Sequence, residues 1–465
     1  MEAMRCPTGL SSAVPGREEK MNREKTFFFT LVLLMVFLFS LSASARFPLA
    51  ERKDAVVITG EQLKPLLGTK INSLSLLIWQ GGKFIPIPFQ VDEKTQKGEY
   101  VFPNGKQKNP EQGNGLLDAQ DELVFMARDA GEPAPEPAPV PESAQKGVKL
   151  VITDPLTKNQ AFAYLLVFSS NPPRSTKDYV CHLVEEERNF VKTDYYWFGE
   201  PIGKGFFDRL HLISPAEKIG PNVSDRIKGR GRIRSLGGLV KINAGEYNTP
   251  TDMVAWIDGP VRVVRRMLGG VELLGLKIRL SGGANNVFYQ DWFYTPIFFS
   301  VPRGVSSLLK GSYMLYTIDF NKNFLGSYYF DPVNPDPVVL DGKMTEQEKN
   351  LDRETHHNWY AVGGDIGNLV ERFIVPDEWT NFVKITTFYV DDSTEEDPPE
   401  AEPGRHQPGF KISGMFEVPP GKYEYRLYYM VSDQKLNQST VQPWLNILDH
   451  PLKISVEKLE QKISQ

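Results

Sequence analysis

Turn-forming residues divide this chain into short segments, and no other feature limits its possible folds so strongly. The 465 residues include 38 glycines and 35 prolines, which are spread along the whole length. Between them lie short runs rich in Tyr, Phe, Trp and Val, the residue types that favour β-strands. Only residues 345–353 and 452–463 have a pattern that favours a helix. The sequence therefore predicts an all-β protein, with a small N-terminal β-sandwich followed by a large antiparallel β-sandwich.

We expect the chain to be divided into three parts. Residues 1–45 form a leader, residues 46–175 form the small sandwich, and residues 176–465 form the large one. Several long consecutive strands with hairpin-like spacing indicate that the large part contains two stacked antiparallel sheets. Residues 391–408 are acidic and rich in proline, and we expect them to form an exposed loop within it.

A second proline-rich segment covers residues 132–142. Its composition is that of a stiff, extended spacer, which is either a domain linker or a long surface loop. Residues 148–153 and 161–169 on its far side have the pattern of strands that complete the same small sandwich. This favours the surface loop.

The leader has the features of a secretory signal peptide over residues 21–45. A basic start with Arg23 and Lys25 precedes an apolar run over residues 27–41, and small residues follow it as a cleavage site. The alternative is a permanent membrane anchor, but the apolar run is shorter than the roughly 20 residues that span a bilayer as a helix. We therefore expect a mature chain that starts at Arg46 and is periplasmic or extracellular, with membrane contact only through the signal peptide.

The charge and cysteine content limit the partners and the compartment. The net charge of −5 favours neither nucleic acid nor an anionic membrane as a partner. Beyond the leader the only cysteine is Cys181, so an internal disulfide bond is excluded. An exported chain with one thiol is more typical of a bacterial envelope than of an animal secretion.

Oxygen-bearing side chains around a glycine suggest one possible metal site. Asn114, Asp118, Asp121 and Glu122 lie near Gly115, as they would in the second half of a calcium-binding loop. The positions that would form the first half of such a loop lack suitable ligands. The alternative is a turn that leads into the strand at residues 123–127. Calcium is the only cofactor that the sequence suggests, and otherwise we expect none.

Five cations alternate along one predicted strand. They are Arg226, Lys228, Arg230, Arg232 and Arg234. Because alternate residues of a strand share a face, all five side chains should project together and require an anion or neighbouring acidic residues. We expect this strand to contact an acidic glycan or another envelope polymer. The alternative is a solvated face or one paired within the protein, for example with the run Glu185-Glu186-Glu187.

The remaining candidate residues are histidines and aromatics. His211 and His357 have side chains that titrate near neutral pH, so either is a candidate general base, although structural histidines are the simpler interpretation. Aromatic residues cluster at 195–197, 289–294 and 359–360. Such rings stack on sugars, but they are also ordinary core residues of a sandwich.

Two parts of the chain resemble known families. The segments Ile87-Pro88-Phe89-Gln90-Val91-Asp92 and 115–125 resemble exported bacterial proteins of unknown function, which share the pattern P-x-Q-x-D … D-G-x-x-D-x-x-D-E-L. Asn114 stands where that pattern often has Asp. Residues 180–430 are more loosely similar to the β-sandwich of mutarotase-like proteins and some polysaccharide-degrading enzymes. The second resemblance implies a carbohydrate context and assigns no catalytic residue.

These observations favour a secreted or envelope protein that recognises carbohydrate or another anionic polymer without catalysis. One alternative is a glycan-active lyase or hydrolase, in which arginines neutralise a uronate and His211 or a tyrosine acts as base. The other is a structural or assembly protein of the cell envelope. A cleft that holds His211 or His357 beside arginines and an acid would favour the enzyme.

Overall fold

The computed structural model describes residues 48–204, 206–235, 240–245, 251–273, 276–279, 284–301, 303, 310–415 and 417–459. These residues form five sheets whose strand pairs are antiparallel, with only short helices between them. The predicted all-β fold is confirmed. The predicted signal peptide lies outside the described residues. No helix in the described ranges is long and apolar enough to cross a membrane.

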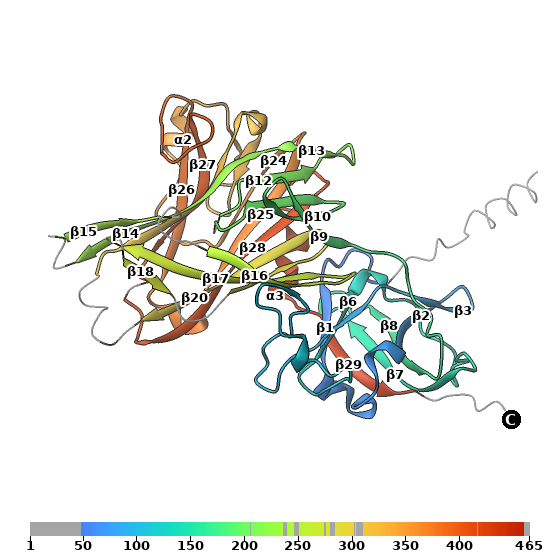
Figure 1. Cartoon of the computed structure of the whole chain (residues 1–465). Coiled ribbons are helices and arrows are strands. Elements are labelled where there is room, and N and C mark those ends of the chain that lie inside the picture. Colours follow the sequence, from blue (N-terminus) through green and yellow to red (C-terminus); the bar gives the residue numbers. More distant parts are fainter. Residues whose placement is uncertain are drawn as a thin grey trace, which may run out of the picture. The chain divides into compact units, whose positions relative to one another are not determined.

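Two sheets form the small sandwich near the N-terminus (Figure 1). The first has the order β1 (Ala55–Thr59), β6 (Glu122–Met126) and β4 (Gln90–Asp92). The second has the order β29 (Lys453–Lys458), β7 (Ala144–Thr153), β8 (Gln160–Phe168), β2 (Leu74–Gln80) and β3 (Lys83–Pro86). Their apolar faces meet in one core, which includes Ile58, Leu76, Phe125, Leu150 and Leu165.

The C-terminal segment corrects two predictions. The pattern of residues 452–463 predicts a helix, but β29 pairs with β7 from Lys453 opposite Thr153 to Lys458 opposite Val148. Over Lys453–Lys458 the helical prediction is wrong because alternate residues, such as Ile454 and Val456, pack against the sandwich core. Residues 460–463 lie outside the described part of the chain. The predicted domain boundary near residue 175 therefore assigns strand β29 to the large part, although it belongs to a sheet of the small sandwich. Contacts group Phe47–Gln465 into one compact unit.

The proline-rich segment 132–142 is a loop, as predicted, and it covers the outer face of the small sandwich. Ala134 and Ala138 are buried against Tyr164 and Phe168. The backbone N–H of Ala134 donates to the hydroxyl of Tyr164 over 2.6 Å.

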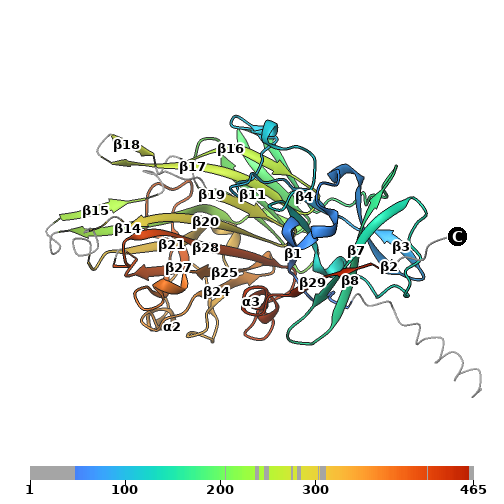
Figure 2. The same ribbon diagram turned by 90° about the horizontal axis from the view of Figure 1, so that it is seen from below.

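A large sheet forms the central layer of the remaining chain, and Figure 2 shows its long strands side by side. Its order is β23 (Val338–Val339), β22 (Tyr328–Phe330), β24 (Trp359–Gly364), β25 (Gly367–Ile374), β28 (Gly421–Ser432), β20 (Trp292–Val301), β19 (Ala284–Phe288), β17 (Val263–Leu273), β16 (Thr251–Asp258) and β5 (Asn104–Gly105), and β18 (Leu276–Arg279) pairs with β17. Side chains alternate between its faces. Along β28, Leu427 and Tyr429 enter one core whereas Tyr428 and Met430 enter another.

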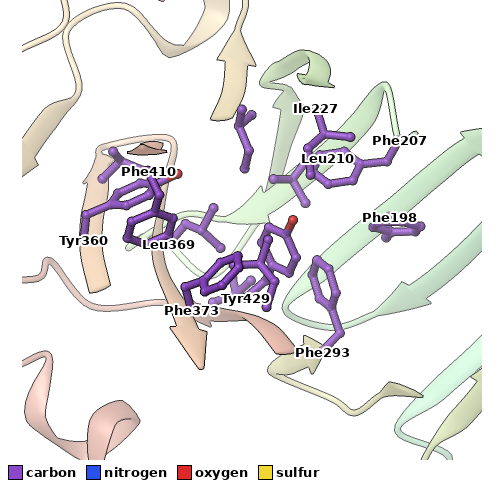
Figure 3. Packing of buried hydrophobic residues seen from close by; sticks show 14 of the residues in the cluster. Phe198, Phe207, Leu210, Ile227, Phe293, Tyr360, Leu369, Phe373, Phe410 and Tyr429 are labelled. Carbon is purple, nitrogen blue, oxygen red and sulfur yellow. The ribbon is translucent and has the colours of Figure 1, made fainter. Parts of the chain in front are cut away.

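Two further sheets cover the face that carries Tyr429. One has the order β13 (Ile219–Asn222), β12 (Arg209–Ile213), β11 (Tyr196–Pro201), β10 (Arg188–Thr193) and β9 (Val180–Glu185). The other has the order β15 (Val240–Ala244), β14 (Ser224–Ser235), β21 (Tyr313–Phe320), β27 (Arg405–Ser413) and β26 (Lys384–Asp392). Figure 3 shows how Phe198 and Ile227 of these sheets, with Phe207 from the segment between β11 and β12, gather with Phe293 and Tyr429 of the central layer.

The opposite face of the central layer packs against strand β6 of the small sandwich and against helix α3 (Gln442–Asp449). The helix predicted at 345–353 is shorter than expected and is present only as α2 (Glu346–Lys349). Thr345 caps this helix, since its hydroxyl accepts from the N–H of Glu348 and the Glu348 side chain accepts from the N–H of Thr345.

The predicted exposed loop at 391–408 is shorter than expected. Strands β26 and β27 occupy both of its ends, and Asp391 and His406 are buried beside each other. Only residues 393–404 connect the two strands. The prediction is wrong at the ends of the segment. There the Asp391 carboxylate is paired with the His406 ring and can therefore be buried, and the acidic, proline-rich composition does not reveal this pairing.

Candidate ligand-binding cavity

A cavity of about 310 Å³ lies between the central layer and the covering strands β11, β14 and β21. Most of its walls are aromatic or aliphatic, from Phe198, Phe206, Phe207, Ile227, Met267, Pro296, Ile297, Phe298, Met314, Tyr316, Tyr425 and Tyr429. Phe298 is 47% exposed, so the cavity opens to solvent on that side. Its size and apolar lining are those of a small-molecule site.

Strand alternation explains why these residues meet. On β14, Ile227 and Gly229 face the cavity, and on the paired strand β21 Met314 and Tyr316 do so. Gly229 stands opposite Tyr316 in the register, and the missing side chain leaves room beside the ring.

A small polar group interrupts the apolar wall. Glu200 of β11 and Asn286 of β19 line the cavity, and both are buried. The buried guanidinium of Arg265 donates to Glu200 and stands opposite Asn286 in the pairing of β17 with β19. Burial lowers the pKa of Arg265 to about 9, so it stays charged at neutral pH and compensates Glu200.

Asn286 has an unused hydrogen-bonding atom. Its side-chain oxygen Oδ1 is buried and has no hydrogen-bond partner among the residues that the structure describes. A buried polar atom normally has a partner, and leaving it without one costs about 1–3 kcal/mol. A donor group on a bound ligand would supply that partner.

The predicted histidines lie elsewhere. Nδ1 of His211 is 3.0 Å from the carbonyl oxygen of Gly220, and the His211 ring packs against Trp197. His357 bridges the Thr387 hydroxyl and the Trp359 carbonyl. Burial lowers the pKa of both rings. Neither residue lines the cavity, and each ring is hydrogen-bonded to a neighbouring group of the protein.

Most of the aromatic residues in the predicted clusters are core residues, whereas Trp197 is half-buried beside His211. Tyr196, Tyr289, Trp292, Phe293 and Tyr360 are all buried, and none of them lines the cavity. The aromatic residues that do line it were not singled out. The available signal was the adjacent pair Phe206-Phe207 and the spacing of Tyr425 and Tyr429 along one strand, but neither distinguishes a site from a core.

The predicted cationic strand is β14, and the structure places its described cationic side chains in two environments. Lys228, Arg230 and Arg232 line a second cavity, on the face of β14 opposite to Ile227 and Gly229. Arg226 lies 4.3 Å from the centre of the Phe206 ring and does not join them. The side chain of Arg234 lies outside the described part of the structure.

The acidic partners of this strand are not the predicted ones. Nζ of Lys228 lies 2.6 Å from Oδ2 of Asp319 and 3.3 Å from Oε1 of Glu400, and Arg230 pairs with Asp397. These acids come from β21 and from the 393–404 loop, whereas the sequence suggested the run Glu185-Glu186-Glu187 as one example of an internal partner. The interpretation of a face paired within the protein therefore describes Lys228 and Arg230.

The candidate metal ligands have other partners. Asn114 Oδ1 accepts from the N–H of Leu116, and its Nδ2 donates to Asp118 Oδ2 over 3.0 Å. The Asp121 carboxylate accepts from the N–H groups of Lys94 and Asp118. Within the described ranges, no three His, Cys, Asp or Glu side chains are arranged to hold a metal ion. The 114–122 segment thus has the hydrogen bonds of a turn.

Glu122 belongs to a buried network around Arg262, which connects the small sandwich to the central layer. The guanidinium of Arg262 lies 2.5 Å from Oε2 of Glu122 and 2.7 Å from Oδ2 of Asp92. The side-chain oxygen of Gln90 accepts from the backbone N–H groups of Val261 and Arg262. Gln90, Asp92 and Glu122 all belong to the motif that resembles exported bacterial proteins. In this chain the motif residues bind Val261 and Arg262, which lead into β17.

Comparisons with known proteins give structural similarity only. No protein-family model and no curated protein matches this sequence. Among solved structures, an α-mannosidase from Enterococcus faecalis V583 is similar with a TM-score of 0.44 and 7% identity, over 89% of this chain and 45% of that one. A glycosyl hydrolase family 38 protein from Enterococcus faecalis is similar with a TM-score of 0.40 and 6% identity, over 89% of this chain and 47% of that one. This chain therefore spans less than half the length of either protein.

Proposed function

We propose that this protein is an exported, non-catalytic carbohydrate-binding protein and that the aromatic cavity is its binding site. The observation that carries the proposal is the combination of aromatic walls with one buried polar group that has an unused acceptor. A sugar ring has apolar C–H faces that pack on aromatic rings and hydroxyl groups that donate and accept hydrogen bonds. The Oδ1 of Asn286 has no partner among the described residues, and a sugar hydroxyl would fit it as donor.

The charge of the cavity supports a neutral sugar. Among the described lining residues Glu200 is the one acid, and it is paired with Arg265, so the polar group has no net charge to offer an acidic ligand. An uncompensated uronate placed there would lose its hydration without gaining a cation. The cavity thus favours a neutral glycan over the acidic polymer that the cationic strand suggested.

The lining residues also favour binding over catalysis. Glycoside hydrolysis commonly uses two carboxyl groups that flank the scissile bond. Among the described residues that line the cavity, Glu200 is the only carboxylate, and there is no histidine. A cleft that combines a histidine, arginines and an acid would have favoured a glycan-active enzyme. The described residues that line this cavity include no histidine and so do not form that combination.

A binding measurement with two cavity variants tests the proposal. The mature chain from Arg46 is screened on a glycan array, and its best neutral ligand is then titrated by calorimetry. Asn286→Leu removes the unused acceptor, and Phe298→Ala removes an aromatic ring at the opening. We expect each to weaken binding about tenfold, which is a typical effect of losing one good contact. Phe382→Ala is the matched control, since Phe382 is 45% exposed but does not line the cavity.

Three outcomes would contradict the proposal. Capture of no neutral glycan removes the carbohydrate assignment. Binding that both cavity variants retain at full affinity places the site elsewhere. Release of shortened or unsaturated products during the titration shows that the protein is an enzyme.

A further inference from the structure

Strands β14 and β21 carry a second cavity on the face opposite to the aromatic one. Its volume is about 150 Å³. On β21, Leu315 and Thr317 line it, whereas Met314 and Tyr316 line the aromatic cavity. The two cavities are therefore separated by one layer of backbone, and a change in one need not alter the other.

The walls of the second cavity are cationic. Four of its lining side chains are positively charged, namely Lys228, Arg230, Arg232 and Arg405. One lining side chain, Asp397, is negatively charged, and three further acids pair with the lining cations: Asp319 and Glu400 with Lys228, and Glu395 with Arg405. Arg232 has no such acidic partner among the described residues, and arginine presents several N–H groups to carboxylate, sulfate or phosphate oxygens.

The Asp397 carboxylate is bound there as a ligand would be. It belongs to the loop between β26 and β27 and pairs with Arg230, while Nε2 of Gln407 donates to its Oδ2 over 3.3 Å. Nζ of Lys228 lies 3.6 Å and Nε of Arg405 lies 3.9 Å from the same oxygen. Burial alone would raise the pKa of Asp397, but these cations outweigh that effect and hold the pKa below its usual value.

Asp397 is not required to neutralise the buried cation of this site. Lys228 and Asp319 are each 1% exposed at their side chains, and 2.6 Å separates Nζ from Oδ2. Lys228 is therefore already compensated when Asp397 is left out of account. Asp397 therefore serves as the partner of Arg230 rather than as the main partner of Lys228.

Donor groups also remain in the cavity. Arg232 is exposed, and its side chain forms no ion pair with any residue in the described ranges. Nε of Arg405 is buried and has no hydrogen-bond partner among the described residues. A second anionic group entering the cavity would find both.

We propose that the second cavity is an oxyanion-binding site, and that Asp397 occupies it as a tethered carboxylate with which a ligand competes. The ligand class is a carboxylate, sulfate or phosphate group, as carried by an acidic glycan. Exchanging the Asp397 carboxylate for another anion keeps Arg230 paired, which avoids the main cost of opening a charged site. This site goes beyond the proposed function, because it lies on the other face of β14 and requires a charged ligand.

The test uses the mature protein with three separate probes: galacturonate, inorganic sulfate and inorganic phosphate. Each is titrated by calorimetry at constant ionic strength set with sodium chloride. Asp397→Asn keeps the shape of the tethered group and removes its charge, so we expect it to tighten binding of at least one probe about tenfold. Arg232→Ala, made in the Asp397→Asn background, should weaken that binding about tenfold. The probe that responds identifies the oxyanion.

Two controls separate this proposal from general charge effects and from the aromatic cavity. Lys97→Ala removes an exposed positive charge of the small sandwich and should leave anion affinity unchanged. Asn286→Leu should also leave it unchanged, whatever that variant does to sugar binding. Melting curves confirm that each variant is folded. The proposal is overturned if no probe binds the Asp397→Asn variant more tightly than the wild type, or if Arg232→Ala does not weaken the binding.

Discussion

Glu371 lies in the middle of the central layer and provides the sharpest test of the packing. It stands on β25 with Tyr360 of β24 and Tyr429 of β28 directly opposite on either side. Its side chain is fully buried, and neither carboxyl oxygen has a hydrogen-bond partner among the described residues. Burial raises the pKa of Glu371 to about 8, against a smaller opposing effect of the Tyr360 hydroxyl.

The sign of the pH dependence follows from this shift. The folded state holds the proton more tightly than the unfolded state, whose carboxyl has a pKa near 4.5. The contribution of Glu371 to stability is therefore fully present below pH 4.5 and is lost as the pH rises towards 8. Between these values the free energy of unfolding falls by about 1.4 kcal/mol per pH unit, which amounts to roughly 3 kcal/mol at pH 7.

Replacing Glu371 by Gln removes the titration and keeps the shape. Urea unfolding of the wild type and Glu371→Gln at pH 5, 6, 7 and 8 gives the difference in free energy at each pH. We expect this difference to move in favour of the variant by about 1.4 kcal/mol per pH unit up to about pH 8. Glu378→Gln makes the same chemical change at an exposed position of the following turn and is the matched control. If the Glu371→Gln difference is independent of pH, the carboxyl ionises as freely in the folded state as in the unfolded one, and the reasoning is refuted.

Two further predictions concern the connection between the small sandwich and the central layer, and a third concerns the predicted metal site. Arg262→Met leaves the carboxylates of Asp92 and Glu122 without their buried cation, so we expect a loss of about 3–5 kcal/mol in urea unfolding, and an unchanged midpoint would show that the network contributes nothing. Gly259→Ala places a Cβ atom in steric conflict with Oε1 of Gln90, which accepts two backbone hydrogen bonds. We expect Gly259→Ala to lower the free energy of unfolding by about 1–3 kcal/mol in the same assay. Retention of wild-type stability would mean that the turn shifts to accommodate the methyl group without losing these hydrogen bonds. The carboxylates of the 114–122 segment already have protein partners, so the melting temperature should be equal with calcium and with a chelator, and a rise at saturating calcium would restore the predicted metal site.

Most of the strands could be predicted because their pattern is local. The segments around Leu76, Val151 and Leu427 show the apolar and aromatic composition of a strand without reference to the rest of the chain. The C-terminal strand β29 could not be predicted in this way. Its lysines and glutamates favour a helix locally, and only pairing with β7, about 300 residues away, makes it a strand.

The candidate sites show the same division. Alternation along β14 correctly placed Lys228, Arg230 and Arg232 on one face, because that depends only on strand geometry. The partners of these cations come from Asp319 and Asp397, which no spacing rule connects to them.

The sequence by itself determined that this protein is built from strands and which side chains share a strand face, since both follow from backbone geometry over a few residues. Only the tertiary structure decided which faces enclose a cavity. The walls of the aromatic cavity come from segments between Phe198 and Tyr429, and their meeting depends on how whole sheets stack. The same stacking decided that the motif residues Asp92 and Glu122 bind Arg262, because a carboxylate pairs with the cation that packing brings to it.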